Sequence, residues 1–310
     1  MKAILFPGQG SQIVGMGSEF YNNFPEVKKI FAKADEALNY SISKIILEGP
    51  ENDLKLTQNT QPAILLVSYA IFYILKNEFN FSFKKIKYFA GHSLGEYSAL
   101  LCAGSLTFND ALQLLFERGK SMQQAVPVGR GSMLAVFNST IEDINKCIVK
   151  LKNKGVCEIA NDNSEGQVIL SGNTESIEEL KFILKENKKK SITLPVSAPF
   201  HCSLMNPAAV KMKEKIDNIN FKKPDYEIIS NVTSLPTNNP VDIKKLLVQQ
   251  IYSKVRWRES ILFMGSEKIN DFIEIGPGKV LSGLLKRILP GSNSFNINSI
   301  NDIKNLNNES

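Results

Sequence analysis

Residues 86–102 read IKYFAGHSLGEYSALLC, and this stretch decides the fold class. The apolar run at Ile86–Ala90 predicts a short buried strand, and Glu96–Cys102 has the composition of a helix. The link Gly91–Gly95 spells G-x-S-x-G, the pattern of a sharp strand-to-helix turn that presents its central serine, Ser93. The alternative is a glycine-rich turn with an incidental serine. We interpret the stretch as part of an α/β fold with an activated serine.

Strands and helices alternate through most of the chain. This order predicts a mainly parallel sheet covered by helices on both faces. Pro62 is expected in the first turn of an apolar helix, and Thr107 with Asp110 forms a capping box for the helix after it. The asparagine- and serine-rich tail after Pro290 is expected at the fringe of the fold. The expected strands are Lys2–Phe6, Glu227–Ser230 and Asp271–Ile275, and the expected helices are Val27–Leu38, Ala63–Leu75 and 108–125.

Between residues 130 and 196 the pattern changes to β-α-β-β-α-β, which is the ferredoxin-like unit. We therefore predict a large, discontinuous α/β domain formed by residues 1–129 and 197–310, with a small ferredoxin-like domain inserted at 130–196. The polar stretch Asn161–Gly166 is expected to be the turn between its second and third strands. The unit's other expected elements are strands at Met133–Phe137, Val156–Ala160, Gln167–Ser171 and Ser191–Val196, and helices at Ile141–Lys152 and Ile177–Glu186.

Composition and charge exclude several classes of protein. The 310 residues carry a net charge of +6 without the interleaved basic and aromatic residues of a nucleic-acid binder. The longest apolar stretch, Ala63–Leu75, is shorter than the ~20 residues that cross a bilayer, and no signal peptide is visible. The four cysteines lack paired spacing and the chain has two histidines, so a metal site is not expected. We expect a cytoplasmic, monomeric protein.

A serine nucleophile needs a base, and the histidines can be assigned by elimination. His92 precedes Ser93 directly and should point away from its hydroxyl. His201, in SAPFHCSLM, is therefore the candidate base. A third, acidic member is not obvious: Asp225 and Asp242 are conceivable, and a backbone carbonyl would equally fix the imidazole tautomer.

Two glycine clusters fail the nucleotide-binding patterns. Gly8-Gln9-Gly10 lacks the third glycine of the dinucleotide fingerprint, and Gly276–Lys279 is followed by valine where a phosphate loop has Ser or Thr. The first cluster is better suited to bring the Gln9 N–H near the serine, where it and the Leu94 N–H would bind an oxyanion. Arg118 lies on a helix with an apolar face. Composition favours a solvated edge position, whereas a carboxylate substrate would favour a buried arginine.

Together these motifs resemble the malonyl-CoA:acyl carrier protein transacylase family over nearly the whole chain. The resemblance implies an α/β-hydrolase-like large domain with a ferredoxin-like insert, which agrees with the two domains predicted from the pattern. The motifs that carry it are FPGQGSQ at 6–12, TQPA at 60–63, GHSLGEYSAL at 91–100, RGKSMQ at 118–123, PFHCSLM at 199–205 and EIGPGKVLSGLLKR at 274–287.

The resemblance also implies roles for individual residues. Ser93 would be the acylated nucleophile and His201 its base, with the Gln250 carbonyl orienting the imidazole. Arg118 would bind the malonyl carboxylate, and Lys286 and Arg287 would engage an acidic carrier protein. Further residues that would line the substrate pocket are Gln61, Met122, Asn161 (or Asn163 in its place) and Phe200.

The implied activity is transfer of a malonyl group from malonyl-CoA to the phosphopantetheine thiol of acyl carrier protein, through malonyl-Ser93, for fatty acid biosynthesis. Serine, histidine and backbone N–H groups suffice for this reaction, so no cofactor or metal is expected. Two alternatives stay open at this point. One is a serine thioesterase or esterase of the same fold, and the other is a catalytically dead scaffold that binds an acyl carrier.

Overall fold

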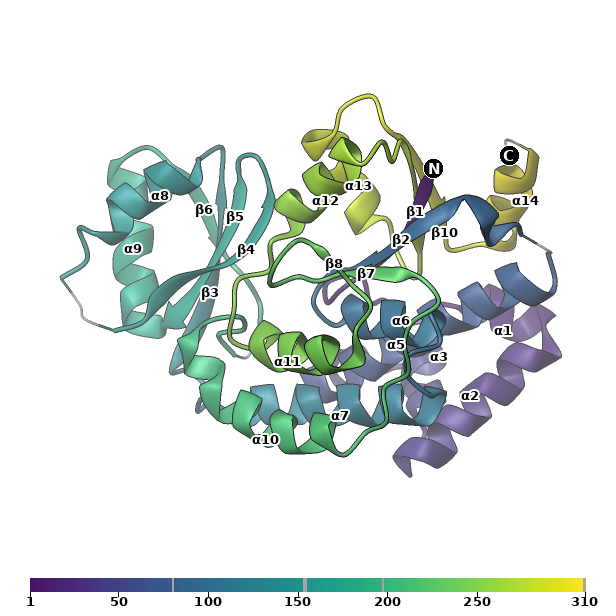
Figure 1. Cartoon of the computed structure of the whole chain (residues 1–310). Helices are drawn as coiled ribbons and strands as arrows, with labels where there is room; N and C mark the ends of the chain where they lie inside the picture. The colour runs from purple at the N-terminus through teal and green to yellow at the C-terminus, as the bar shows by residue number, and fades with distance from the viewer. Residues whose placement is uncertain (80, 153–154, 197, 309–310) are drawn as a thin grey trace.

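The apolar strand at Lys2–Phe6 lies inside a six-stranded sheet with the order β10-β9-β1-β2-β7-β8 (Figure 1). All neighbours in it are parallel except β8, which pairs antiparallel with β7. The computed structural model describes residues 1–79, 81–152, 155–196 and 198–308. The strands are β1 (Lys2–Phe6), β2 (Ile86–Gly91), β7 (Glu227–Ile229), β8 (Pro236–Thr237), β9 (Asp271–Ile275) and β10 (Asn293–Ile297).

Helices cover both faces of this sheet, as the alternation of elements predicts (Figure 1). Along β1 the side chains alternate: Ile4 and Phe6 enter the core beneath α5 and α6, whereas Ala3 and Leu5 pack with α12 and α13. The helices are α1 (Ser18–Asn23), α2 (Pro25–Leu38), α3 (Ile42–Glu48), α4 (Glu51–Lys55), α5 (Thr57–Asn77), α6 (Gly95–Cys102), α7 (Phe108–Gln124), α10 (Asn206–Asp217), α11 (Pro240–Gln250), α12 (Trp257–Ser266), α13 (Val280–Ile288) and α14 (Ile300–Asn308), with short 3-10 turns at Phe83–Lys85 and Ser203–Met205.

A second, antiparallel sheet has the order β4-β5-β3-β6, with two helices on its outer face (Figure 1). This is the strand order of the ferredoxin-like unit, so the predicted fold class is confirmed. The boundaries 130–196 stay a prediction, and residue 197 lies outside the described residues. The elements are β3 (Gly131–Phe137), α8 (Ile141–Ile148), β4 (Cys157–Ser164), β5 (Gln167–Asn173), α9 (Thr174–Glu186) and β6 (Lys190–Thr193).

The long apolar helix begins six residues earlier than predicted. Helix α5 starts at Thr57, so Pro62 lies inside it rather than in its first turn. The added turn is polar but buried, because its side chains bond to carbonyls of α4: Thr60 Oγ1 donates to Leu54 O at 2.6 Å and Asn59 Nδ2 to Asp53 O at 2.9 Å. Apolar periodicity does not detect such a turn. The correction places Gln61 on a helix.

Two other expectations are wrong. The stretch Asn161–Gly166 is mostly strand, since β4 continues to Ser164 and the turn is confined to residues 165–166. The tail after Pro290 is not a fringe: β10 pairs with β9 in parallel, and Ile303 of α14 is buried. Backbone hydrogen bonds hold an edge strand even when its side chains are polar. Among the described residues, no helix has the length and apolarity needed to span a membrane.

Candidate active site

The turn at Ser93 is as tight as its glycines suggest. Ser93 has φ of 53°, a left-handed conformation that is strained for a residue with a side chain. A Cβ at Gly91 would lie 1.9 Å from the carbonyl carbon of Gly95, and a Cβ at Gly95 would lie 2.3 Å from Phe6 O. Only glycine fits at both positions, and the serine is thereby fixed at the N-terminus of α6.

His201 is the imidazole that reaches the serine. Its Nε2 lies 2.8 Å from Ser93 Oγ, and its Nδ1 lies 2.8 Å from the Gln250 carbonyl oxygen. The backbone carbonyl, rather than Asp225 or Asp242, is therefore the group that bonds Nδ1. Burial, and next the nearby Arg118 guanidinium, lower the pKa of His201 to about 3, so the imidazole is neutral and Nε2 can accept a proton at physiological pH.

His92 takes a supporting position, as predicted. Its Nε2 lies 2.8 Å from Asn163 Oδ1, and its ring lies against Trp257 with the centroids 5.5 Å apart. Burial lowers the pKa of this histidine too. The elimination that led to His201 from the sequence agrees with this geometry.

Arg118 is buried, with 1% of its surface exposed, so the solvated edge position that composition favours is wrong. One guanidinium nitrogen, Nη1, donates to Gln61 Oε1 at 2.7 Å. The other, Nη2, donates to Gln250 Oε1 at 2.9 Å and to Ser93 Oγ at 3.1 Å. Burial lowers the pKa of Arg118, but the group stays a cation. A fixed positive charge therefore lies beside the nucleophile.

A cavity of about 410 Å³ opens over these groups. The cavity lies between the large and the small domain. Strands β3, β4 and β5 of the small domain supply one wall, and the turn after β1 of the large domain supplies another. Gln61 and Met122 contact each other at its base, with Gln61 Nε2 3.9 Å from Met122 Sδ. The cavity brings together most of the predicted residues: Gln9, Gln61, Ser93, Leu94, Arg118, Met122, Asn161, Phe200 and His201, and also Asn163.

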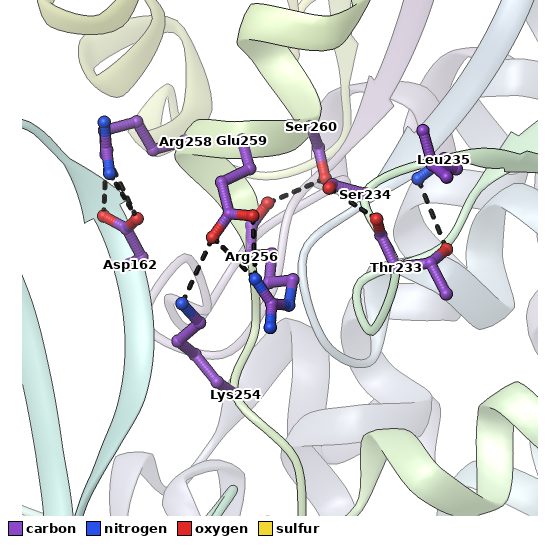
Figure 2. Close-up of polar contacts among 9 residues, drawn as sticks. All are labelled: Asp162, Thr233, Ser234, Leu235, Lys254, Arg256, Arg258, Glu259 and Ser260. Atoms are coloured by element: carbon purple, nitrogen blue, oxygen red, sulfur yellow. Dashed lines mark hydrogen bonds and ion pairs between the residues drawn. The ribbon is translucent and has the colours of Figure 1, made fainter.

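The wall formed by β4 is held by a second group of polar contacts (Figure 2). Asp162 lies between the two asparagines of the cavity and points away from it, where Arg258 of α12 bonds both of its carboxylate oxygens at 2.9–3.1 Å. The backbone adds to this contact, because Asp162 N donates to Val255 O at 3.0 Å. Beside it, Glu259 accepts from Lys254 and Arg256. We call Asp162, Lys254, Arg256, Arg258 and Glu259 the junction cluster.

The residues predicted to engage a carrier lie outside the cavity. Lys286 and Arg287 are exposed near the end of α13. Arg287 reaches the cavity rim indirectly, because its Nη1 donates to Oε1 of Gln167, a lining residue, at 2.7 Å. Arg287 therefore contacts a residue that borders the cavity, and Lys286 is its exposed neighbour in the chain.

Sequence reasoning missed two residues of the site. Asn231 accepts a hydrogen bond from Ser93 N at 2.7 Å and donates to Gly91 O at 2.7 Å. Glu96 lies in the first turn of α6 and is bonded to Asn231 and to Gln250. Asn231 follows a predicted strand, and the carboxyl ends of parallel strands meet at one sheet edge, so a signal for it was present.

Comparison with known proteins adds an independent finding. A family model described as an acyl transferase domain matches residues 4–298, so fold and site together define an acyl transferase. The malonyl CoA-acyl carrier protein transacylase of Bacillus subtilis (strain 168) is 44% identical over 288 residues, covering 92% of this chain and 90% of that protein. The transacylase of the same name from Haemophilus influenzae is 40% identical over 96% of this chain and 95% of its own length.

Solved structures agree with these relatives. The acyl-carrier-protein-S-malonyltransferase of Bartonella henselae superposes with a TM-score of 0.96 at 40% identity, covering 99% of this chain and 98% of that one. A malonyl-transacylase in complex with a type II PKS acyl-carrier protein superposes with a TM-score of 0.96 at 36% identity, covering 100% of this chain and 99% of that one. The chain therefore belongs to the malonyl-CoA:acyl carrier protein transacylase family.

Proposed function

We propose that this chain moves a malonyl group from malonyl-CoA to the phosphopantetheine thiol of an acyl carrier protein, with Ser93 as the acylated residue. The observation that carries the proposal is the buried Arg118, whose guanidinium lies 3.1 Å from Ser93 Oγ. Malonyl differs from ordinary acyl groups by a free carboxylate, and arginine binds a carboxylate through two parallel hydrogen bonds. An esterase for plain acyl chains has no use for a cation at this position.

In the first half-reaction, Ser93 Oγ attacks the thioester carbon while His201 Nε2 accepts the hydroxyl proton. The developing oxyanion is bound by the N–H groups of Gln9 and Leu94 at the cavity wall. When the carbon–sulfur bond breaks, His201 returns the proton to the departing thiolate. The products are CoA thiol and malonyl-Ser93, and the Gln250 carbonyl stabilises the transient imidazolium through Nδ1.

The second half-reaction is the reverse with a different thiol. The carrier's phosphopantetheine thiol gives its proton to His201 and attacks the ester carbon, and Ser93 leaves with the proton. Gln61, Met122, Asn161 and Phe200 would surround the acyl group, since all four border the cavity. These steps use the chain's own side chains and backbone and call on no cofactor.

The cavity is formed within one chain, which supports a monomer as the working unit. The four free thiols support a reducing, cytoplasmic setting.

Intact-mass spectrometry after incubation with malonyl-CoA tests the proposal. We expect one malonyl adduct on the wild type, none on Ser93→Ala, and loss of the adduct when carrier protein is added, with the malonyl group recovered on the carrier. Release of free malonate at the same rate with and without carrier would contradict transfer and favour a thioesterase. Absence of the adduct from the wild type would favour a dead scaffold.

The acidic carrier is a further part of the proposal. Because Lys286 and Arg287 are exposed and do not line the cavity, while Arg287 contacts Gln167 on its border, they are suited to contact the protein rather than the acyl group. We expect Lys286→Ala combined with Arg287→Ala to raise the apparent KM for carrier roughly 5- to 30-fold, about 1–2 kcal/mol, with acylation by malonyl-CoA unaffected. Lys211→Ala, at an exposed position of α10, is the matched control. Equal carrier KM values for the double variant and the control would refute the role.

A further inference from the structure

The mechanism gives no role to the buried acid that lies next to the nucleophile turn. Glu96 lies three residues after the nucleophile in α6, with 2% of its surface exposed. Burying a carboxyl group is costly unless its hydrogen bonds are satisfied. Its presence directly beneath the nucleophile turn therefore calls for a reason.

Two hydrogen bonds to the Glu96 side chain converge on one oxygen. Oε2 accepts from Gln250 Nε2 at 2.7 Å and from the backbone N–H of Asn231 at 3.0 Å. Neither partner belongs to α6, so the carboxyl group ties its own helix to the end of α11 and to the segment after β7.

Gln250 and Asn231 in turn form hydrogen bonds to groups of the active site. The Gln250 carbonyl bonds His201 Nδ1, and its side-chain oxygen bonds Arg118 Nη2. The side chain of Asn231 bonds the backbone on both sides of His92, at Gly91 O and Ser93 N. The nucleophile, the base and the carboxylate-binding arginine thus share a single common support.

We propose that Glu96 is the positioning residue of this site: its Oε2 fixes Gln250 and Asn231, and through them sets the geometry of Ser93, His201 and Arg118. Among the residues that the structure describes, the Ser–His pair has no acid bonded to its imidazole. Instead, the acid Glu96 bonds Gln250, and Gln250 bonds the imidazole. The inference rests on the proposed function only for the part that concerns Arg118.

Three substitutions of Glu96 distinguish the effect of where its oxygens lie from the effect of its charge. Glu96→Gln keeps an oxygen that can accept both hydrogen bonds but removes the charge. Glu96→Asp keeps the charge but withdraws the oxygens by one methylene, and Glu96→Ala removes both. If position matters, we expect the single-turnover rate of Ser93 malonylation to fall roughly 10- to 100-fold in the Ala and Asp variants, with Gln at least 5-fold faster than Asp.

Glu274 provides a matched control. It is also a buried carboxylate, 1% exposed, and accepts from Leu281 N, Ser282 N and Ser282 Oγ at the start of α13. Glu274→Gln and Glu274→Ala should lower the unfolding temperature as the Glu96 variants do, without changing the acylation rate of the folded protein. A purely structural role for Glu96 predicts that both sites behave alike.

A second readout keeps the test independent of malonyl chemistry. Labelling of Ser93 by a fluorophosphonate probe, followed by intact mass, reports the Ser93–His201 pair without using Arg118. If wild type takes up no malonyl group but is labelled at least 5-fold faster than Glu96→Ala, the proposed function fails and the inference stands. Equal labelling rates in wild type and Glu96→Ala, or an Asp variant faster than Gln in malonylation, would overturn the inference.

Discussion

The polar groups behind Ser93 and those of the junction cluster balance their charges differently. Behind Ser93, the group made of Glu96, Arg118, Asn231 and Gln250 is buried, and amides separate its one carboxyl from its one cation. In the junction cluster, cations contact carboxylates directly and solvent reaches most of the members. We call the first group the elbow cluster.

The difference follows from what each cluster has to hold. Direct pairing with Glu96 would neutralise Arg118 and leave nothing to attract a substrate carboxylate, whereas an amide between them fixes both side chains and leaves the cation available. The junction cluster only has to join β4 to α12, and ion pairs do so at lower cost where water reaches them. Predictions that remove one member from each cluster test this comparison.

Arg118→Ala is expected to have the largest effect. Loss of a charge-assisted contact with the malonyl carboxylate should cost about 2–4 kcal/mol of transition-state binding, roughly 30- to 1,000-fold in kcat/KM for malonyl-CoA. Acetyl-CoA has no carboxylate, so its transfer should be spared or raised. Parallel initial-rate measurements with both thioesters check the prediction.

Arg118→Lys is the control for this prediction. Lysine keeps the positive charge but lacks the planar fork, so it should recover only part of the malonyl activity. An equal loss with malonyl-CoA and acetyl-CoA in Arg118→Ala would mean that the arginine supports the elbow cluster without contacting the carboxylate.

The elbow cluster should also respond to pH. Burial raises the pKa of Glu96 from its ordinary value of 4.5 to about 7, while backbone and side-chain hydrogen bonds from Asn231 and Gln250 and the charge of Arg118 oppose the rise. The folded protein therefore binds more protons than the unfolded chain between these values, and stability is lost as the pH rises through 7. Glu96→Gln does not titrate. Relative to wild type, its unfolding free energy should gain about 2 kcal/mol between pH 5 and pH 8 in urea titrations.

Glu259 of the junction cluster supplies the contrast. Its Arg256 and Lys254 partners outweigh its partial burial and lower its pKa, so any change in stability falls below pH 4.5. The difference between Glu259→Gln and wild type should stay constant from pH 5 to pH 8. A constant difference for Glu96→Gln as well would show that Glu96 is ionised throughout that range.

Local pattern made part of the site predictable from the sequence. The G-x-S-x-G turn identifies Ser93 because its glycines are required by contacts a few residues away, and with two histidines in the chain the base follows by elimination. The fold class followed in the same way from the alternation of strands and helices. The role of Arg118 came from resemblance, since composition alone placed it at an exposed edge.

Long-range packing explains what the sequence did not reveal. Arg118 is buried because α7 approaches α5 closely: a Cβ at the neighbouring Gly119 would lie 2.5 Å from Thr57 O. Glu96 matters through Asn231 and Gln250, which are more than 130 residues away in the chain. Neither contact leaves a periodic or local signature. The contact between Asp162 and Arg258, which joins β4 to α12, likewise leaves no local signature in the sequence.

Substitutions of the junction-cluster arginines are expected to have the smallest effects, and they compare a buried ion pair with an exposed one. Asp162 is 1% exposed, so it would be left buried without its partner, but Arg258 is 32% exposed and water can replace part of it. We expect Arg258→Ala to lose about 1–3 kcal/mol of stability. Arg256→Ala, which leaves Lys254 on Glu259, should cost ~0–1 kcal/mol and less still at high salt. Urea unfolding at low and high ionic strength compares the two. Equal losses would mean that burial of Asp162 contributes nothing, and that the backbone contacts to Val255, rather than the Asp162–Arg258 ion pair, join this part of the wall to the large domain.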